Sequence, residues 1–287
     1  MSEVLEKVRC NLCGGEQTRV FLRMEGWAYR RCRSCGLVYQ NPRPVFGDLK
    51  KRYGDTYFAY ELSNQENFFN LMKLGLRDIG FDRLFNGDCS NLRFLDVGCA
   101  TGLLLNHLRQ KGWRTTGVEL CRASAEYGIQ RFGLDIIIGT LEQAAFPDDS
   151  FDVVHFSHLI EHVPDPRGLL LEVGRVVKPE GHVVVTTPNA GGLHARFSRS
   201  GWRSAIPDHV YLFTRKTLRR MLRETGFRVV RQVSWGGIPA GRRPDWLKRP
   251  ADRLAKTLNV GDVMLFHCVP EPRVEGRREP YPVLERR

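Results

Sequence analysis

One stretch decides the fold of this 287-residue chain: Phe94-Leu95-Asp96-Val97-Gly98-Cys99-Ala100-Thr101-Gly102. An apolar run that ends in a carboxylate predicts a buried strand, and the small residues after it predict a tight turn into a helix that begins near Leu103. Small side chains let a ligand approach the backbone closely. The stretch therefore predicts a nucleotide-type ligand site at the end of a buried strand.

From Arg93 onward, short apolar runs alternate with amphipathic stretches. This alternation is typical of a parallel sheet covered by helices on both faces. We therefore predict an α/β fold with a Rossmann-like, doubly wound sheet of seven strands, mostly parallel and with the last strand antiparallel. The expected strands cover residues 93–97, 114–119, 135–138, 151–156, 182–187, 228–234 and 262–268. The expected helices cover residues 102–111, 122–132, 167–177 and 214–225, and a loop at 239–250 precedes a short helix at 251–258.

The charges beside the turn favour one ligand. A pyrophosphate binds helix-end amides and disfavours a neighbouring anion, whereas S-adenosylmethionine carries a sulfonium, an ammonium and no phosphate. Asp96 therefore suits S-adenosylmethionine. Glu119 ends the next predicted strand, 21 residues after Gly98, and is placed to accept the ribose hydroxyls of either ligand. Residues 139–142 and 146–152 follow the third strand, where an adenine ring would lie.

Residues 90–235 resemble the class I methyltransferases, in particular the group that includes ubiquinone-biosynthesis O-methyltransferases and many small-molecule and sugar methyltransferases. The resemblance rests on motifs spread along this region. They are the Asp96 to Gly102 turn, Glu119, Phe146-Pro147-Asp148-Asp149-Ser150-Phe151-Asp152, Ile160-Glu161-His162-Val163-Pro164-Asp165-Pro166, Lys178-Pro179-Glu180-Gly181-His182, Thr187-Pro188-Asn189, and His209-Val210-Tyr211-Leu212-Phe213-Thr214 before a helix that ends at Gly226-Phe227.

The resemblance implies roles for named residues. Contacts to the methionine portion would come from Asp96 and the backbone of Gly98, Cys99, Ala100 and Gly102. Contacts to ribose and adenine would come from Glu119, Leu120, Thr140 and Leu141, with Ser157 and His158 at the entrance to the substrate side. Members of the group usually carry Asp where Thr140 stands, so a backbone group would contact the adenine amino group here. A Rossmann-like sheet without a cofactor is the alternative.

Four of the eight cysteines form two Cys-x-x-Cys pairs, Cys10 with Cys13 and Cys32 with Cys35, separated by 18 residues. This is the spacing of a four-thiolate zinc site. We expect a structural zinc ribbon, with an iron–sulfur centre or a redox dithiol as alternatives. A closed four-sulfur site leaves no open position for a substrate, so the metal is not expected to do chemistry.

The chain is expected to divide into a zinc-ribbon module (1–44), a helical linker of one or two helices (45–90), an S-adenosylmethionine-binding domain (91–270) and a loose tail (271–287). Its composition, 42% hydrophobic and 26% charged, fits a globular protein. We see no secretory leader and no apolar run near the ~20 residues that span a bilayer. A cytoplasmic location is therefore expected.

The sequence indicates the catalytic residues less clearly than it indicates the cofactor site. Methyl transfer needs alignment, and it needs a base only when the acceptor is a poorly acidic group. Candidates on the substrate side are His155, His158, Glu161, His162, His209 and Tyr211. We expect His209, beside Tyr211, as the base, with His158 as a further catalytic residue. For each of them a purely structural role is the alternative.

The net charge of +12 is unevenly distributed. Residues 196–231 hold ten basic and two acidic side chains, whereas residues 96–152 hold five basic and eight acidic ones. The basic stretch could meet an acidic substrate, RNA or an anionic membrane, or it could be a solvated helix face.

We therefore expect an S-adenosylmethionine-dependent methyltransferase that acts on an O, N or C atom of a small-molecule acceptor such as a sugar, lipid or secondary metabolite. One alternative is an RNA methyltransferase. Against it, Ser157-His158-Leu159-Ile160 replaces the Asn-Pro-Pro-aromatic turn of many enzymes that methylate base amines. The other alternative is a catalytically silent scaffold protein, against which the intact Asp96 and Glu119 argue.

Overall fold

The computed structural model describes residues 3–236, 253 and 255–272. Of the helix expected at 251–258, residues 253 and 255–257 are helical. The loop expected at 239–250 and the tail from residue 273 onward lie outside the described residues.

The central sheet has seven strands, as predicted. They are β6 (Arg93–Val97), β7 (Arg114–Glu119), β8 (Asp135–Ile138), β9 (Phe151–Ser157), β10 (Val177–Pro188), β12 (Phe227–Trp235) and β13 (Val263–Pro270). Their order is β12-β13-β10-β9-β6-β7-β8. The pairs from β10 to β8 are parallel, and β13 runs antiparallel to both of its neighbours. The predicted doubly wound sheet with an antiparallel last strand is confirmed.

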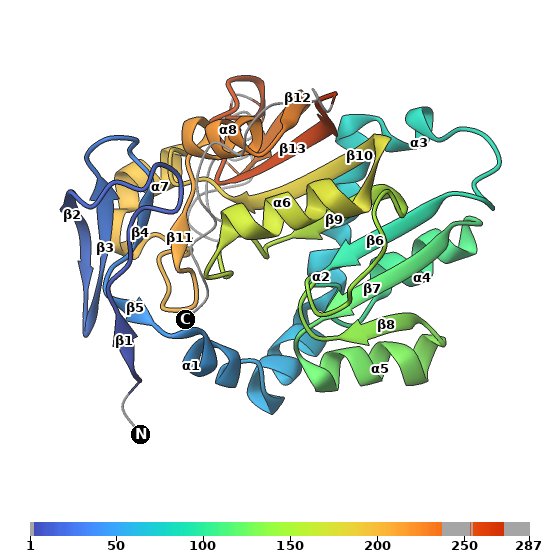
Figure 1. Ribbon diagram of the computed structural model, residues 1–287, viewed down its shortest axis with the longest axis horizontal. Coiled ribbons are helices and arrows are strands. Elements are labelled where there is room, and N and C mark those ends of the chain that lie inside the picture. Colours follow the sequence, from blue (N-terminus) through green and yellow to red (C-terminus); the bar gives the residue numbers. More distant parts are fainter. Residues whose placement is uncertain (1–2, 237–252, 254, 273–287) are drawn as a thin grey trace.

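Helices cover both faces of this sheet (Figure 1). Before residue 253, the α-helices of the described residues are α1 (Phe46–Lys51), α2 (Asp55–Ile79), α3 (Phe81–Leu84), α4 (Leu103–Gln110), α5 (Arg122–Phe132), α6 (Pro166–Val176), α7 (Leu193–Ser198) and α8 (Arg215–Glu224). Side chains of α2 to α5 pack with Phe94 on one face, and those of α6 and α8 pack with Leu95 on the other. Because neighbouring strand residues point to opposite faces, a continuous apolar strand serves both cores.

The region between the ribbon and the sheet contains three helices, so the expectation of one or two was wrong. The break lies at Gly80, which adopts a left-handed φ of 78° and ends the 25-residue helix α2 before α3 begins. Glycine reaches this conformation without the steric cost that a Cβ brings. The long helix α2 therefore lies beside α4 and α5 as part of the main fold.

The ribbon is joined to the main domain through a shared sheet. Strands β2 (Thr18–Met24), β3 (Trp27–Cys32) and β4 (Val38–Gln40) are extended by β11 (Tyr211–Leu212), which pairs antiparallel with β4. A separate pair links β1 (Leu5–Glu6) to β5 (Arg43–Pro44). Figure 1 shows the ribbon and the pair β8 and α5 on opposite sides of the molecule. Leu37 and Tyr39 belong to the same apolar core as Phe213 and Leu218.

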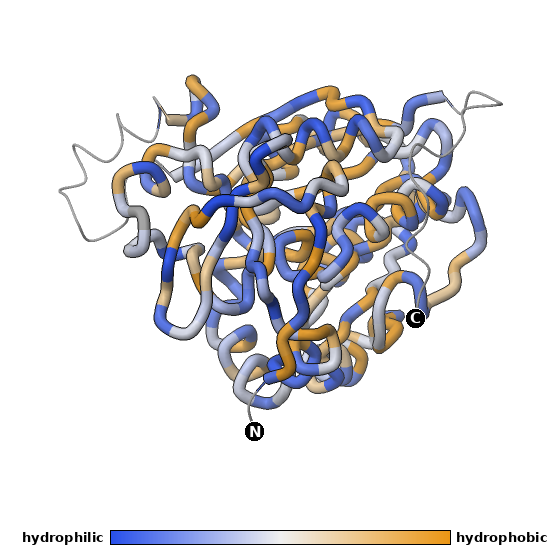
Figure 2. The backbone as a smooth tube through the Cα atoms, turned by 60° about the vertical axis from the view of Figure 1, so that its left-hand side comes forward, coloured by the Kyte–Doolittle hydropathy of each residue, from blue (hydrophilic) through white to orange (hydrophobic). Residues whose placement is uncertain are grey.

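Within the described residues, no helix is long and apolar enough to cross a membrane. Hydrophobic and hydrophilic residues instead alternate over short distances along the chain (Figure 2). This is the pattern of helices and strands that bury one face and expose the other.

Candidate cofactor and acceptor site

The turn after β6 follows a left-handed backbone path that favours glycine. Gly98, Ala100 and Gly102 all have a left-handed φ, of 71°, 51° and 77°. A Cβ on Gly102 would overlap the side chain of Leu134. The N–H of Gly98 donates to the carbonyl of Val118 at 2.8 Å, which ties the turn to the end of β7. At position 102, glycine is therefore required both by the left-handed conformation and by the close packing against Leu134.

Two buried carboxylates flank this turn at the ends of neighbouring strands. The Glu119 carboxylate accepts the N–H of Ala100 at 2.9 Å and that of Cys121 at 2.7 Å. Burial, together with the nearby Glu61, raises the pKa of Glu119 to about 7. Oδ1 of Asp96 lies 2.7 Å from Nδ1 of His155, and burial raises the pKa of Asp96. Carboxylates at this position can accept ribose hydroxyls and attract a cation.

The predicted adenine contacts lie at the same edge of the sheet. Glu119 and Ile138 are partners in the parallel pair of β7 and β8, so Leu120 and the Thr140 turn leave the sheet side by side. Leu141 is buried, and the N–H of Thr140 donates to Oε1 of Gln143 at 3.0 Å. The strand ends therefore bring together all the residues that the sequence indicated for ribose and adenine.

Sequence reasoning missed a polar stripe on α2 that covers this edge. Tyr57, Glu61 and Gln65 are spaced by four residues and therefore share one face of the helix. The Ser124 hydroxyl donates to Glu61 at 2.8 Å, and the Thr101 hydroxyl donates to Gln65 at 3.1 Å. The sequence signal was this polar spacing, which was obscured because the aromatic residues of the same segment suggested only a packed linker.

On the side where the sequence predicts the acceptor, Glu161 is buried, with a side chain that is 1% exposed. Its Oε1 lies 3.1 Å from Nδ1 of His158, and its Oε2 accepts the Thr187 hydroxyl at 2.9 Å. Burial raises its pKa, but His158, His162 and His209 outweigh burial and hold the pKa of Glu161 at about 2. The carboxylate is therefore ionised at neutral pH and orients the imidazole of His158.

His158 follows Ser157 at the end of β9 and adopts a left-handed φ of 54°. Such a conformation is uncommon for a residue with a Cβ and often marks a functional position. The His158 side chain is 29% exposed. An imidazole whose Nδ1 is held by Glu161 and whose ring is partly exposed can exchange a proton with a bound molecule through Nε2.

His209 is buried, and its Nδ1 donates to the Ser204 carbonyl at 2.8 Å. Burial lowers the pKa of His209 to about 4, so its imidazole is neutral at pH 7. The centroid of its ring lies 4.6 Å from the centroid of the His162 ring, and the two rings are nearly perpendicular. Glu161, His162 and His209 place their ligand atoms within 4.8 Å of one another, a distance that could suit a metal ion. Both Glu161 oxygens, however, already have hydrogen-bond partners.

Tyr211 lies in β11 and faces the ribbon. Its hydroxyl accepts from Nη1 of Arg43 at 2.9 Å and donates to the Pro164 carbonyl at 3.1 Å. Burial raises its pKa above that of a free tyrosine. The structure therefore gives this phenol a fixed place between the ribbon and the loop that follows Glu161.

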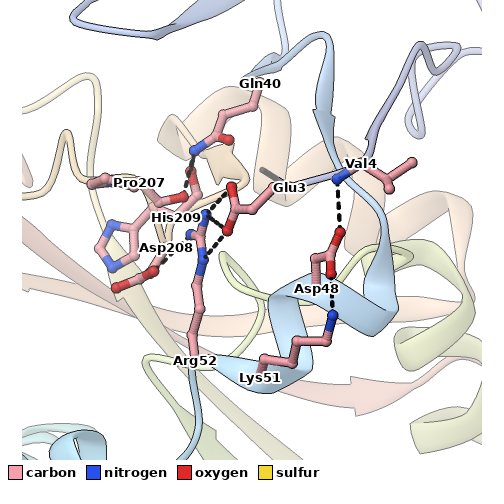
Figure 3. A network of polar contacts seen from close by, with 9 residues as sticks. All are labelled: Glu3, Val4, Gln40, Asp48, Lys51, Arg52, Pro207, Asp208 and His209. Atoms are coloured by element: carbon pink, nitrogen blue, oxygen red, sulfur yellow. Dashed lines mark hydrogen bonds and ion pairs between the residues drawn. The ribbon is translucent and has the colours of Figure 1, made fainter. Parts of the chain in front are cut away.

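The ribbon and α1 form a wall beside His209 (Figure 3). Nε2 of Gln40 donates to the carbonyls of Pro207 and His209, at 2.7 and 3.0 Å. Arg52 bridges Glu3 and Asp208, each at 2.7 Å. A cavity of about 470 Å³ adjoins this wall. It is lined by Glu3, Leu5, Arg23, Met24, Gly26, Trp27, Ala28, Gln40, Pro42, Pro44, Arg52 and Pro207.

The four ribbon cysteines converge, as their spacing indicated. Their sulfur atoms lie within 4.8 Å of one another, with 3.4 Å between Cys10 and Cys35 and 3.5 Å between Cys13 and Cys32. None forms a disulfide. Thiolates around one zinc ion, at about 2.3 Å from the metal, would stand about 3.8 Å apart. The cluster therefore fits a tetrahedral metal ion.

Comparison with known proteins agrees with this geometry. Residues 71–232 match the model of a methyltransferase domain. Because the match covers more than half of the chain, the protein belongs to the methyltransferase family. The predicted family is confirmed.

The chain is 33% identical, over 109 residues, to a ubiquinone biosynthesis O-methyltransferase of Alkalilimnicola ehrlichii, covering 36% of this chain and 44% of that protein. It spans about half the length of the curated relatives it matches.

Two solved structures share the fold. One is a chain of the complex between the Haloferax volcanii Trm112 methyltransferase activator and a methyltransferase, with 20% identity, a TM-score of 0.60, and 77% of this chain and 97% of that chain covered. The other is an S-adenosylmethionine-dependent methyltransferase of Archaeoglobus fulgidus, with 22% identity, a TM-score of 0.53, and 75% and 100% covered.

Proposed function

We propose that the protein transfers a methyl group from S-adenosylmethionine to an O, N or C atom of a small molecule. The observation that carries this proposal is the left-handed glycine turn flanked by the buried carboxylates of Asp96 and Glu119. When bound, S-adenosylmethionine supplies an electrophilic methyl group on a sulfonium. The ubiquinone biosynthesis relatives support a small-molecule acceptor.

The proposed donor site uses the strand ends and turns described above. Asp96 and the turn would bind the methionine portion, and Glu119 would accept the ribose hydroxyls. The full set is Asp96, Gly98, Cys99, Ala100, Gly102, Glu119, Leu120, Thr140, Leu141, Ser157 and His158. Burial of Asp96, Glu119 and Leu141 excludes water and strengthens the polar contacts of the two carboxylates.

We assign proton removal from the acceptor to His158. Glu161 holds its Nδ1–H, so Nε2 is left to accept a proton, and the imidazolium that forms is stabilised by the carboxylate. His209 has its Nδ1–H bound to Ser204, and its neutral Nε2 orients the acceptor. Tyr211 supports this wall through its bonds to Arg43 and Pro164.

We assign structural zinc to the four cysteines, because a closed four-sulfur site of this geometry is typical of zinc. The ribbon then holds the wall beside His209 through Gln40 and Arg43. The adjoining cavity, at about 470 Å³, has the size of a small-molecule pocket. RNA is the second candidate acceptor, supported by the basic stretch 196–231, although Arg219 and Arg220 there bind Gln232 and Glu224 of the same chain.

The test is calorimetric titration of S-adenosylmethionine into the wild type and into the Asp96→Ala, Glu119→Ala double variant. We expect binding that the double variant loses. Undiminished binding by the double variant would refute the proposed donor site. Transfer of tritiated methyl to phenolic and sugar acceptors, compared with total RNA, then separates the two acceptor classes.

A further inference from the structure

Glu61 lies among the groups of the proposed donor site although it comes from a distant helix. The residue is 8% exposed, and the Ser124 hydroxyl at the start of α5 donates to its carboxylate. On its own helix, Tyr57 also donates to it, and this bond and that of Ser124 partly offset the effect of burial, which raises its pKa. Glu61 thus joins α2 to the edge of the sheet where Glu119 ends β7.

Three carboxylates surround the same part of the glycine turn. Burial, followed by the charges of Glu119, Asp96 and Glu61, raises the pKa of the Cys99 thiol well above its usual value. Asp96 has the imidazole of His155 as its partner. In the described part of the chain, Glu61 and Glu119 have only hydrogen bonds from hydroxyl and backbone N–H groups, and neither forms an ion pair with Lys or Arg.

Two buried carboxylates without a cation repel each other, so protonation of one of them is favoured. A ligand that carries a positive charge would balance the negative charge of the Glu61 and Glu119 carboxylates. The methyl donor carries a sulfonium, whereas S-adenosylhomocysteine, which remains after transfer, has a neutral thioether. The two molecules are otherwise nearly identical, so a charge in the protein can distinguish them.

We propose that Glu61 is a specificity residue that makes the site prefer the cationic methyl donor over the neutral product, and so promotes product release after each transfer. This inference rests on the proposed function, because it needs the donor to bind at the turn beside Glu119. Binding of the donor favours the ionised form of both carboxylates, so a proton held by Glu61 or Glu119 is released into solvent. Binding of the product leaves that proton in place.

The test is calorimetric titration of S-adenosylmethionine and S-adenosylhomocysteine into wild type and Glu61→Gln, in two buffers of different ionisation enthalpy at pH 7. In the wild type we expect tighter binding of the donor, with more protons released than for the product. Glu61→Gln should lower the ratio of donor to product affinity by about ten-fold, the equivalent of one pKa unit, and should abolish the difference in proton release.

Two variants make the result specific. Glu66→Gln removes the same charge from an exposed position on the same helix, and should leave both the affinity ratio and the proton count unchanged. Glu61→Asp keeps the charge and should retain the preference for the donor even if shortening the side chain weakens both ligands. An unchanged ratio in Glu61→Gln would overturn the inference while leaving the proposed function intact. A wild type that binds neither ligand would instead refute the proposed function.

Discussion

The proposed donor site and the proposed acceptor site, both at one edge of the central sheet, are assembled in different ways. At the donor end, Glu119 reaches Ala100 and Cys121, which lie 19 and 2 residues away in sequence. At the acceptor end, Gln40 and Arg43 of the ribbon bind His209 and Tyr211 across 169 and 168 residues. The proposed donor site is therefore built mainly from local turns, whereas the proposed acceptor wall is held by hydrogen bonds from the ribbon. Substitutions at the donor site should therefore leave the acceptor site largely intact, and substitutions at the acceptor site should do the same for the donor site.

The largest expected effect is the loss of the ribbon metal. Structural zinc contributes on the order of 10 kcal/mol in small zinc domains, so chelation or Cys10→Ser should unfold the ribbon and release β11 from β4. Hydrogen exchange should rise at residues 38–40 and 211–212, and methyl transfer should be lost. Affinity for S-adenosylmethionine should change much less. Unchanged exchange at these residues in metal-free protein would show that the ribbon does not hold the acceptor wall.

The second effect concerns the pair His158 and Glu161. A positioned general base contributes roughly 10²- to 10⁴-fold to a rate, so His158→Gln should lower kcat by that factor. Glu161→Gln removes the charge that orients the imidazole and should lower kcat by a similar or smaller factor. Calorimetry should give a Kd for S-adenosylmethionine that changes much less than kcat in both variants.

His209→Gln is the matched comparison for the choice of base. If it lowers kcat more than His158→Gln does while the melting temperature stays unchanged, the assignment of His158 as the base is wrong and His209 takes that role.

The third effect is confined to the donor end. Hydrogen bonds to a charged group each contribute about 1.5–3 kcal/mol, and Glu119→Ala removes the acceptor of the ribose hydroxyls. The Kd for S-adenosylmethionine should rise by about 10- to 100-fold. Glu126→Ala, on the exposed side of α5, is the control and should bind normally. Equal effects of the two changes would mean that Glu119 does not contact the ligand.

The contrast between the two ends also explains what could be read from the sequence. The seven strands and the helices α4, α5, α6 and α8 follow from local periodicity and from helix starts such as Asp165, whose side chain accepts the N–H of Gly168 at 2.9 Å. The convergence of the four cysteines follows from their spacing. These features depend on residues that are close in sequence.

Other features depend on packing between distant segments, which one sequence does not display. Nothing near Tyr211 indicates that two residues there extend the ribbon sheet through β4. The inward position of Glu61 likewise depends on where α2 lies against α5. A polar residue in a segment rich in aromatic side chains is usually exposed, and only the tertiary contacts reverse that expectation.

The smallest expected effect is a pH dependence at the donor end, set by Glu119. Its pKa of about 7 lies above the value of 4.5 for a free carboxyl. The folded protein therefore binds the proton more tightly than the unfolded chain. The stability that Glu119 contributes is complete below about pH 4.5 and is lost as the pH rises through about 7.

Donor binding should follow the opposite course, because the ionised carboxylate is the better acceptor of ribose hydroxyls and the better partner of a cation. A group that titrates near pH 7 changes its ionised fraction about ten-fold between pH 6 and pH 8, so affinity for S-adenosylmethionine should rise by at most about that factor. Calorimetry over this range measures it. Glu119→Gln, which cannot ionise, should bind weakly and show a flat profile. A wild-type affinity that falls as the pH rises would place the controlling proton on another group, and the two ends would then not be independent.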